Sequence, residues 1–163
     1  MLLSKESIVS WYNPKHFPPN IFKLFIVILL CAFAQGCKVT MVSAYDEKTD
    51  NAVTQFQKDL ETFFVSVEGQ SGAAGCDMNS HKTFYDKATV DIRAMKLRAS
   101  SMEKNQITID QLDLLEDSFG DLKDLHEIAC LADGQITALR SSFNSHITAI
   151  LKFELAKKRG SDD

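Results

Sequence analysis

The chain has 163 residues, a formal net charge of −4, 45% hydrophobic residues and 25% charged residues. This composition is typical of one soluble globular domain and excludes an intrinsically disordered chain, which would be poorer in apolar residues. All three prolines and the only tryptophan lie within the first 19 residues. The sequence therefore divides into an N-terminal address segment and a proline-free remainder, and it predicts location and architecture rather than a specific activity.

An apolar segment of ten residues, Leu24 to Phe33, follows Lys23. Ten residues of helix span about 15 Å, half of a roughly 30 Å hydrocarbon core, so the segment is too short to cross a membrane comfortably. A short apolar stretch behind a basic leader, here containing Lys5 and Lys15, is typical of a secretory signal peptide. The alternative interpretation is a buried or interfacial apolar helix.

Residues 34–37, Ala-Gln-Gly-Cys, resemble the lipobox of bacterial lipoproteins. The resemblance implies cleavage after Gly36, with residues 1–36 as the signal peptide, Cys37 as the lipid-attachment site and residues 37–43 as a short tether. Acyl chains such as palmitate would then hold the protein on a membrane surface, because each buried CH₂ group contributes about 0.8 kcal/mol. Lys38 stands where Asp would signal inner-membrane retention, so the resemblance implies the periplasmic face of the outer membrane.

The part that remains after cleavage is more acidic than the whole chain. Loss of Lys5, Lys15, Lys23 and Glu6 reduces 18 basic and 22 acidic residues to 15 and 21, a net charge of −6. A nucleic-acid-binding domain normally needs a basic face, so we expect no nucleic-acid partner.

Four segments repeat apolar residues at spacings of three and four, the pattern of amphipathic helices. The expected helices cover about residues 44–68, 79–101, 108–129 and 135–160. Their similar lengths and short connections predict an all-α, up-down-up-down antiparallel four-helix bundle over residues 44–160, followed by a tail at 161–163.

Local signals predict where the helices begin and end. Ser43 or Asp46 is expected to cap the first helix, and Gly69 to end it. A capping box is predicted at the start of the third helix, between Thr108 and Gln111. The apolar stripe predicted for the fourth helix runs from Ile136 to Leu155.

The two ends of this region resemble those of a group of small bacterial lipoproteins to which no activity is assigned. The similar residues are 45–50, Tyr-Asp-Glu-Lys-Thr-Asp, and 150–160, Ile-Leu-Lys-Phe-Glu-Leu-Ala-Lys-Lys-Arg-Gly. The resemblance implies an envelope location and an all-helical domain only.

Two cysteines remain after Cys37. Cys76 precedes the second helix and Cys130 follows the third, so an up-down bundle places both at the same end. In an oxidising periplasm they would form a disulfide that contributes about 3 to 4 kcal/mol of stability. His81 and His126 would lie nearby, which leaves a Cys₂His₂ zinc site as a weaker alternative. We expect neither a metal nor another cofactor.

The third helix carries an acidic stripe, and the fourth ends in a basic cluster. The stripe, Asp110, Asp113, Asp117, Asp121 and Asp124, is expected to be a solvated face, and the alternative is a surface that binds a cationic partner. We expect it to pair in part with basic residues of the second helix, namely Lys82, Lys87, Arg93 and Lys96. The cluster, Lys152, Lys157, Lys158 and Arg159, is expected to contact anionic lipid headgroups on the side of Cys37.

The familiar enzyme motifs are absent from the sequence, including metalloprotease, phosphate-loop, nucleophile-elbow and di-iron patterns. We therefore expect a lipid-anchored envelope protein with a structural or protein-interaction role rather than an enzyme. The alternative is a binding module that holds a small apolar ligand among core phenylalanines, namely Phe56, Phe63, Phe84, Phe119 and Phe143.

Overall fold

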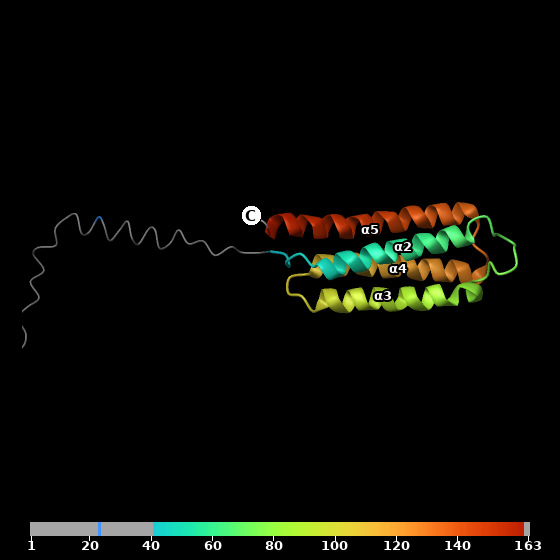
Figure 1. Cartoon of the computed structure of the whole chain (residues 1–163), viewed down its shortest axis with the longest axis horizontal. Helices are drawn as coiled ribbons and strands as arrows, with labels where there is room; N and C mark the ends of the chain where they lie inside the picture. The colour runs from blue at the N-terminus through green and yellow to red at the C-terminus, as the bar shows by residue number, and fades with distance from the viewer. Residues whose placement is uncertain (1–22, 24–40, 162–163) are drawn as a thin grey trace, which may run out of the picture. The chain divides into compact units, whose positions relative to one another are not determined.

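A computed structural model of the chain describes Lys23 and residues 41–161. The predicted signal peptide other than Lys23, the lipid site Cys37 and residues 162–163 lie outside the described residues. Within them the chain forms four α-helices, one 3₁₀ turn and no strand (Figure 1). These elements are α2 (Glu47–Val67), η1 (Met78–His81), α3 (Lys82–Ser100), α4 (Gln106–Ile128) and α5 (Asp133–Ser161). The all-α prediction is confirmed.

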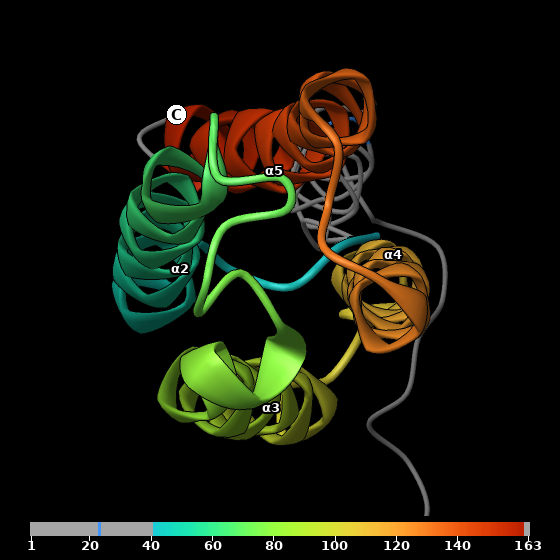
Figure 2. The same ribbon diagram turned by 90° about the vertical axis from the view of Figure 1, so that its right-hand side faces the viewer.

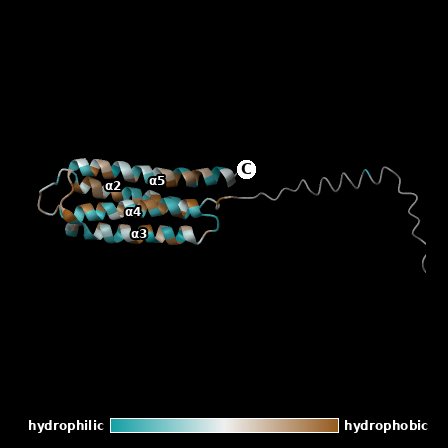
Figure 3. Ribbon diagram, turned by 180° about the vertical axis from the view of Figure 1, so that it is seen from behind, coloured by the Kyte–Doolittle hydropathy of each residue, from teal (hydrophilic) through white to brown (hydrophobic). Residues whose placement is uncertain are grey.

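Each long helix packs against two others: α2 and α4 both contact α3 and α5. Figure 2 shows the four helices around a common centre in the order α2, α3, α4, α5. Hydrophilic and hydrophobic residues alternate along every helix (Figure 3), as expected for helices that bury one face. The described hydrophobic core is built from residues of all four long helices, the first in sequence being Val53 and the last Ile150. Residues 40–163 form a compact unit with this core, and we expect them to fold by themselves.

The start and end of α2 agree with the sequence signals. Asp46 is its N-cap, and the Asp46 carboxylate accepts hydrogen bonds from the Thr49 backbone N–H and hydroxyl, at 3.2 and 2.6 Å. After the last residue, Val67, the chain turns through Gly69, whose φ of 71° is a left-handed conformation that glycine adopts without steric cost.

The predicted capping box at the start of α4 is wrong. This helix begins at Gln106, two residues before Thr108. The Thr108 hydroxyl is fully buried, donates to Glu154 of α5 at 3.0 Å, and accepts from Lys157. Its partners therefore lie on another helix, and a spacing rule that considers only the local sequence could not find them.

The buried face of α5 also departs from the prediction at its C-terminal end. The stripe Phe143, Ile147 and Ile150 continues at spacings of four and three to Glu154 and Lys157, which are 1% and 5% exposed. Leu155, expected in the stripe, is 42% exposed. Two charged residues thus occupy positions that the helical period assigns to the core.

Both buried charges have hydrogen-bond partners inside the protein. The Lys157 ammonium donates to the Glu154 carboxylate at 2.6 Å, to the Asn105 side-chain oxygen at 2.7 Å and to the Thr108 hydroxyl at 2.8 Å. An ammonium has three donors, so none is left without a partner. We call these four residues the buried ionic cluster.

The segment before α2 is attached to this cluster. The Ser43 hydroxyl donates to the Asn105 side-chain oxygen at 2.7 Å, and the Ser43 N–H donates to the Lys104 carbonyl at 3.0 Å. The Asp46 N–H points to the second Glu154 oxygen at 3.4 Å. Residues 43–46 are therefore fixed beside the α3–α4 connection and α5.

An ion pair with α3 strengthens the same attachment. Two nitrogens of the Arg98 guanidinium donate to the Asp46 carboxylate, each at 2.5 Å. Arg98, followed by the hydrogen bonds from Thr49, holds the pKa of Asp46 well below its usual range. The N-cap of α2 therefore stays ionised at neutral pH.

The variant Lys157→Ala should lower the free energy of unfolding by about 3 to 5 kcal/mol, because it leaves Glu154 as a buried charge without its counterion. Lys152→Ala, at an exposed position of the same helix, is the control and should change stability by less than about 0.5 kcal/mol. Urea unfolding of residues 40–163 measures both.

The double variant Glu154→Leu, Lys157→Met should recover most of the loss, since apolar residues of similar volume replace buried ion pairs at little cost. A loss below 1 kcal/mol in Lys157→Ala would contradict the description of the buried ionic cluster.

Candidate functional site

The helical domain has two chemically different ends. The first, which we call the Ser43 end, consists of residues 41–46, the α3–α4 connection and the last turns of α5. The second, the disulfide end, consists of residues 68–81 and 126–135. The two connections at the disulfide end, α2–α3 and α4–α5, lie together away from the α3–α4 connection (Figure 1).

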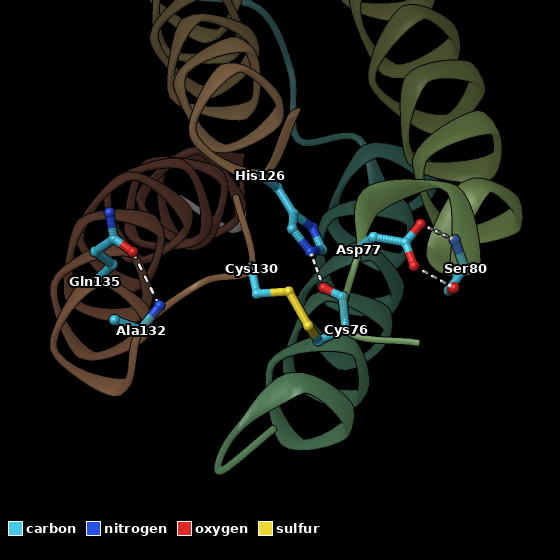
Figure 4. Close-up of a disulfide and its surroundings, with 7 residues drawn as sticks. All are labelled: Cys76, Asp77, Ser80, His126, Cys130, Ala132 and Gln135. Carbon is cyan, nitrogen blue, oxygen red and sulfur yellow. Dashed lines mark hydrogen bonds between the residues drawn. A yellow bond between two sulfur atoms is a disulfide. The ribbon is translucent and has the colours of Figure 1, made fainter. Parts of the chain in front are cut away.

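A Cys76–Cys130 disulfide joins these two connections, with Cα atoms 5.4 Å apart (Figure 4). The closed loop is 54 residues long. The sequence predicts that these two cysteines meet at one end of the helices, and the structure brings them together there.

His126 hydrogen-bonds to the backbone next to the disulfide. Its Nε2 lies 2.7 Å from the Cys76 carbonyl, and its Nδ1 lies 2.6 Å from the Tyr85 hydroxyl. A carbonyl only accepts, so we assign the proton to Nε2 and the accepting role to Nδ1. Burial raises the pKa of Tyr85, which keeps this hydroxyl protonated as the donor. The imidazole thus connects α3, α4 and the backbone at Cys76.

Sequence analysis missed this pair of residues as a structural unit. Tyr85 and His126 are each 2% exposed and occupy core-facing positions of α3 and α4. The available signal was a polar group at an inward position of an apolar stripe, because such a group needs a hydrogen-bond partner.

The alternative zinc set, Cys76, His81, His126 and Cys130, does not form a metal site. Both cysteines are used by the disulfide, and both ring nitrogens of His126 have hydrogen-bond partners. The ring of His81 lies 5.8 Å from that of His126, and burial, followed by His126, lowers the pKa of His81. The described residues contain no group of three or more His, Cys, Asp or Glu side chains placed to hold a metal.

The core phenylalanines contact one another. Phe63 and Phe84 are stacked, with ring centroids 4.1 Å apart, and Phe56 meets Phe119 edge to face at 6.4 Å. Phe143 packs against Phe64 at 6.0 Å. These rings therefore pack against one another across the helices of the core.

The acidic face of α4 is paired with α3 at one place. Lys96 forms salt bridges with Asp113, at 2.7 Å, and with Glu116. Lys82 is expected to pair with α4 but contacts Asp86 on its own helix, α3. Lys87, for which the same pairing is predicted, contacts Asp59 on α2 and Asp91 on α3. The side chains of Asp117, Asp121 and Asp124 are exposed.

A shallow groove of about 610 Å³ lies between α4 and α5 at the disulfide end. Its lining residues are Asp121, Asp124, Leu125, Ile128, Gln135, Ala138, Leu139 and Ser142. Ile128 is 83% exposed and Leu125 is 37% exposed. The groove therefore combines apolar side chains with carboxylates from α4.

The basic cluster of α5 divides into exposed and buried residues. Lys152, Lys158 and Arg159 are exposed, and the Lys158 ammonium lies 5.2 Å from the centre of the Tyr45 ring. Lys157 belongs to the buried ionic cluster. Its predicted contact with a membrane surface is therefore wrong, because its ammonium points into the protein.

No family model, curated protein or solved structure matches this chain. Among the described helices, none is both long enough and apolar enough to cross a membrane.

Loss of the disulfide through Cys76→Ser should lower the free energy of unfolding by about 3 to 4 kcal/mol, because the unfolded chain regains the freedom of the 54-residue loop. Adding Cys130→Ser should cost little more, since the bond is already lost. Urea unfolding measures both variants. Peptide mass maps should differ with and without reductant, and identical maps would show that the bond is absent.

Proposed function

We propose that this is a lipid-anchored protein of the bacterial cell envelope with a structural or protein-interaction role. In this proposal residues 1–36 are removed as a signal peptide, and lipid on Cys37 holds the protein at the periplasmic face of the outer membrane. The support is the order of basic leader, short apolar segment and lipobox-like residues 34–37.

The attachment of residues 43–46 is the structural observation that carries the proposal furthest. Ser43 is held at the Ser43 end of the domain by its bonds to Lys104 and Asn105. Ser43 is six positions after Cys37 along the chain, and an extended peptide of that length reaches at most about 20 Å. A lipid on Cys37 would therefore keep the Ser43 end close to the bilayer and leave the disulfide end facing away.

We further propose that the domain is an up-down-up-down antiparallel four-helix bundle. Helices adjacent in the sequence contact each other, and α2 also contacts α5. The chain connections are short enough to join neighbouring ends, as this topology requires.

The exposed basic residues at the end of α5 suit a membrane-facing role. Lys152, Lys158 and Arg159 would lie toward anionic headgroups, each well-placed charge contributing about 1 kcal/mol. The covalent lipid supplies the main anchor in this proposal, and the basic cluster orients the domain.

The lipid anchor is tested by metabolic labelling with a palmitate analogue. The wild-type protein should be labelled and remain with the membrane fraction. Cys37→Ala should lose the label and, because the acyl chains are gone, leave the membrane. Cys31→Ala, a cysteine inside the proposed signal peptide, is the matched control and should keep the label. Continued labelling of Cys37→Ala would refute the anchor.

The orienting role is tested with residues 40–163 and vesicles of phosphatidylcholine, with and without phosphatidylglycerol. The triple variant Lys152→Gln, Lys158→Gln, Arg159→Gln should bind the anionic vesicles at least about tenfold more weakly than the wild type. A triple variant with the same charge change elsewhere, Lys58→Gln, Lys82→Gln, Arg93→Gln, should bind nearly as the wild type does. Equal binding by the two triple variants would rule out the orienting role.

A further inference from the structure

The groove between α4 and α5 has an unusual combination of exposure and chemistry. Two aliphatic side chains of α4, Leu125 and Ile128, stand at its rim, and Ala138 and Leu139 of α5 line it from the other side. Leu114, 54% exposed, extends the apolar row along α4. The positions 114, 121, 125 and 128 follow the heptad spacing that places residues on one side of a helix.

The charge of this surface is strongly one-sided. Within Gln106–Ile128, Lys123 is the one basic residue other than His126. The acidic residues of the same helix are Asp110, Asp113, Glu116, Asp117, Asp121, Asp124 and Glu127. Asp121 and Asp124 line the groove itself, and no Lys or Arg is among its lining residues. A cationic occupant would meet complementary charge there, whereas an acidic one would be repelled.

Two other occupants fit less well. A second copy of this domain, facing the groove with its own α4, would bring two acidic helices together, which costs free energy through like-charge repulsion. An anionic lipid surface would be repelled by the same carboxylates. The charge of α4 therefore selects a basic partner.

We propose that this groove binds a cationic amphipathic helix of a partner protein, with the partner's apolar residues against Leu125, Ile128 and Leu139 and its Lys or Arg residues beside Asp121 and Asp124. The inference deepens the proposed interaction role and rests on it. Leu114 and Ile128 are 14 residues apart in one helix, a rise of about 21 Å. A partner helix of about 14 to 18 residues would cover this row, and it would present apolar anchors at spacings of three and four.

The probe is a synthetic peptide of about 18 residues made of Leu and Lys, with Leu on one helical face. A second peptide carries Glu in place of every Lys, and a third has the composition of the first in scrambled order. Binding to residues 40–163 is measured by fluorescence anisotropy at low and high salt. The Lys peptide should bind at least tenfold more tightly than either control, and its binding should weaken at high salt.

Two pairs of variants locate the contact. Ile128→Asp should weaken binding at least tenfold, although it adds a negative charge, because it removes the apolar anchor. Leu97→Asp, at a position 74% exposed on α3, should bind as the wild type does. Asp121→Asn with Asp124→Asn should weaken binding about fivefold, whereas Glu127→Gln with Glu103→Gln, which removes the same charge outside the groove, should change it less than twofold.

Three results would overturn the proposal: equal affinity for the Lys and Glu peptides, unchanged binding by Ile128→Asp, or self-association of the domain that Ile128→Asp abolishes. The last result, seen by analytical ultracentrifugation, would assign the groove to a second copy. Palmitate labelling of Cys37 is independent of these measurements. Labelled protein that binds no peptide would refute the binding role of the groove and support the lipid anchor. Unlabelled protein that binds the peptide would refute the lipid anchor and support the binding role of the groove.

Discussion

The Lys157–Glu154 pair is the constraint on which the arrangement of this domain depends. Moving two charges out of water costs several kcal/mol for each ion, so the pair is tolerable only where every donor and acceptor finds a partner. Here Asn105, the residue before α4, and Thr108 in α4 supply the remaining partners of Lys157, and the Asp46 N–H lies against Glu154. A shift of α5 by one residue would separate both charges from their hydrogen-bond partners. A contact made only of apolar side chains would tolerate the same shift better. The pair therefore selects one register among α4, α5 and the segment before α2.

Helical periodicity predicted the described elements well, because amphipathic spacing reports which face a helix buries. It failed where polar side chains find their partners on other helices. The local sequence predicts Thr108 as a cap and Lys157 as a surface cation, because each is an ordinary choice for a helix end, whereas both belong to the buried ionic cluster. Helical periodicity does not indicate the Tyr85–His126 contact for the same reason. The cysteine pair was predictable, since helix order alone brings the two connections to one end.

The two ends of the domain differ in chemistry. One end receives residues 43–46 and carries the exposed cations of α5, and the other holds the disulfide and the acidic groove between α4 and α5. If lipid on Cys37 supplies the anchor, the first end rests against the membrane and the second is presented to other proteins. The disulfide joins the α2–α3 and α4–α5 connections and so limits their local opening.

The buried ionic cluster fixes residues 43–46 beside the α3–α4 connection and α5. Amide hydrogen exchange, followed by NMR in residues 40–163, shows whether the cluster holds this segment. In the wild type the Asp46 amide should exchange slowly; in the Glu154→Leu, Lys157→Met variant it should exchange at least tenfold faster, while amides inside α2 stay protected. Unchanged protection of the Asp46 amide in that variant would show that the segment is held without the cluster.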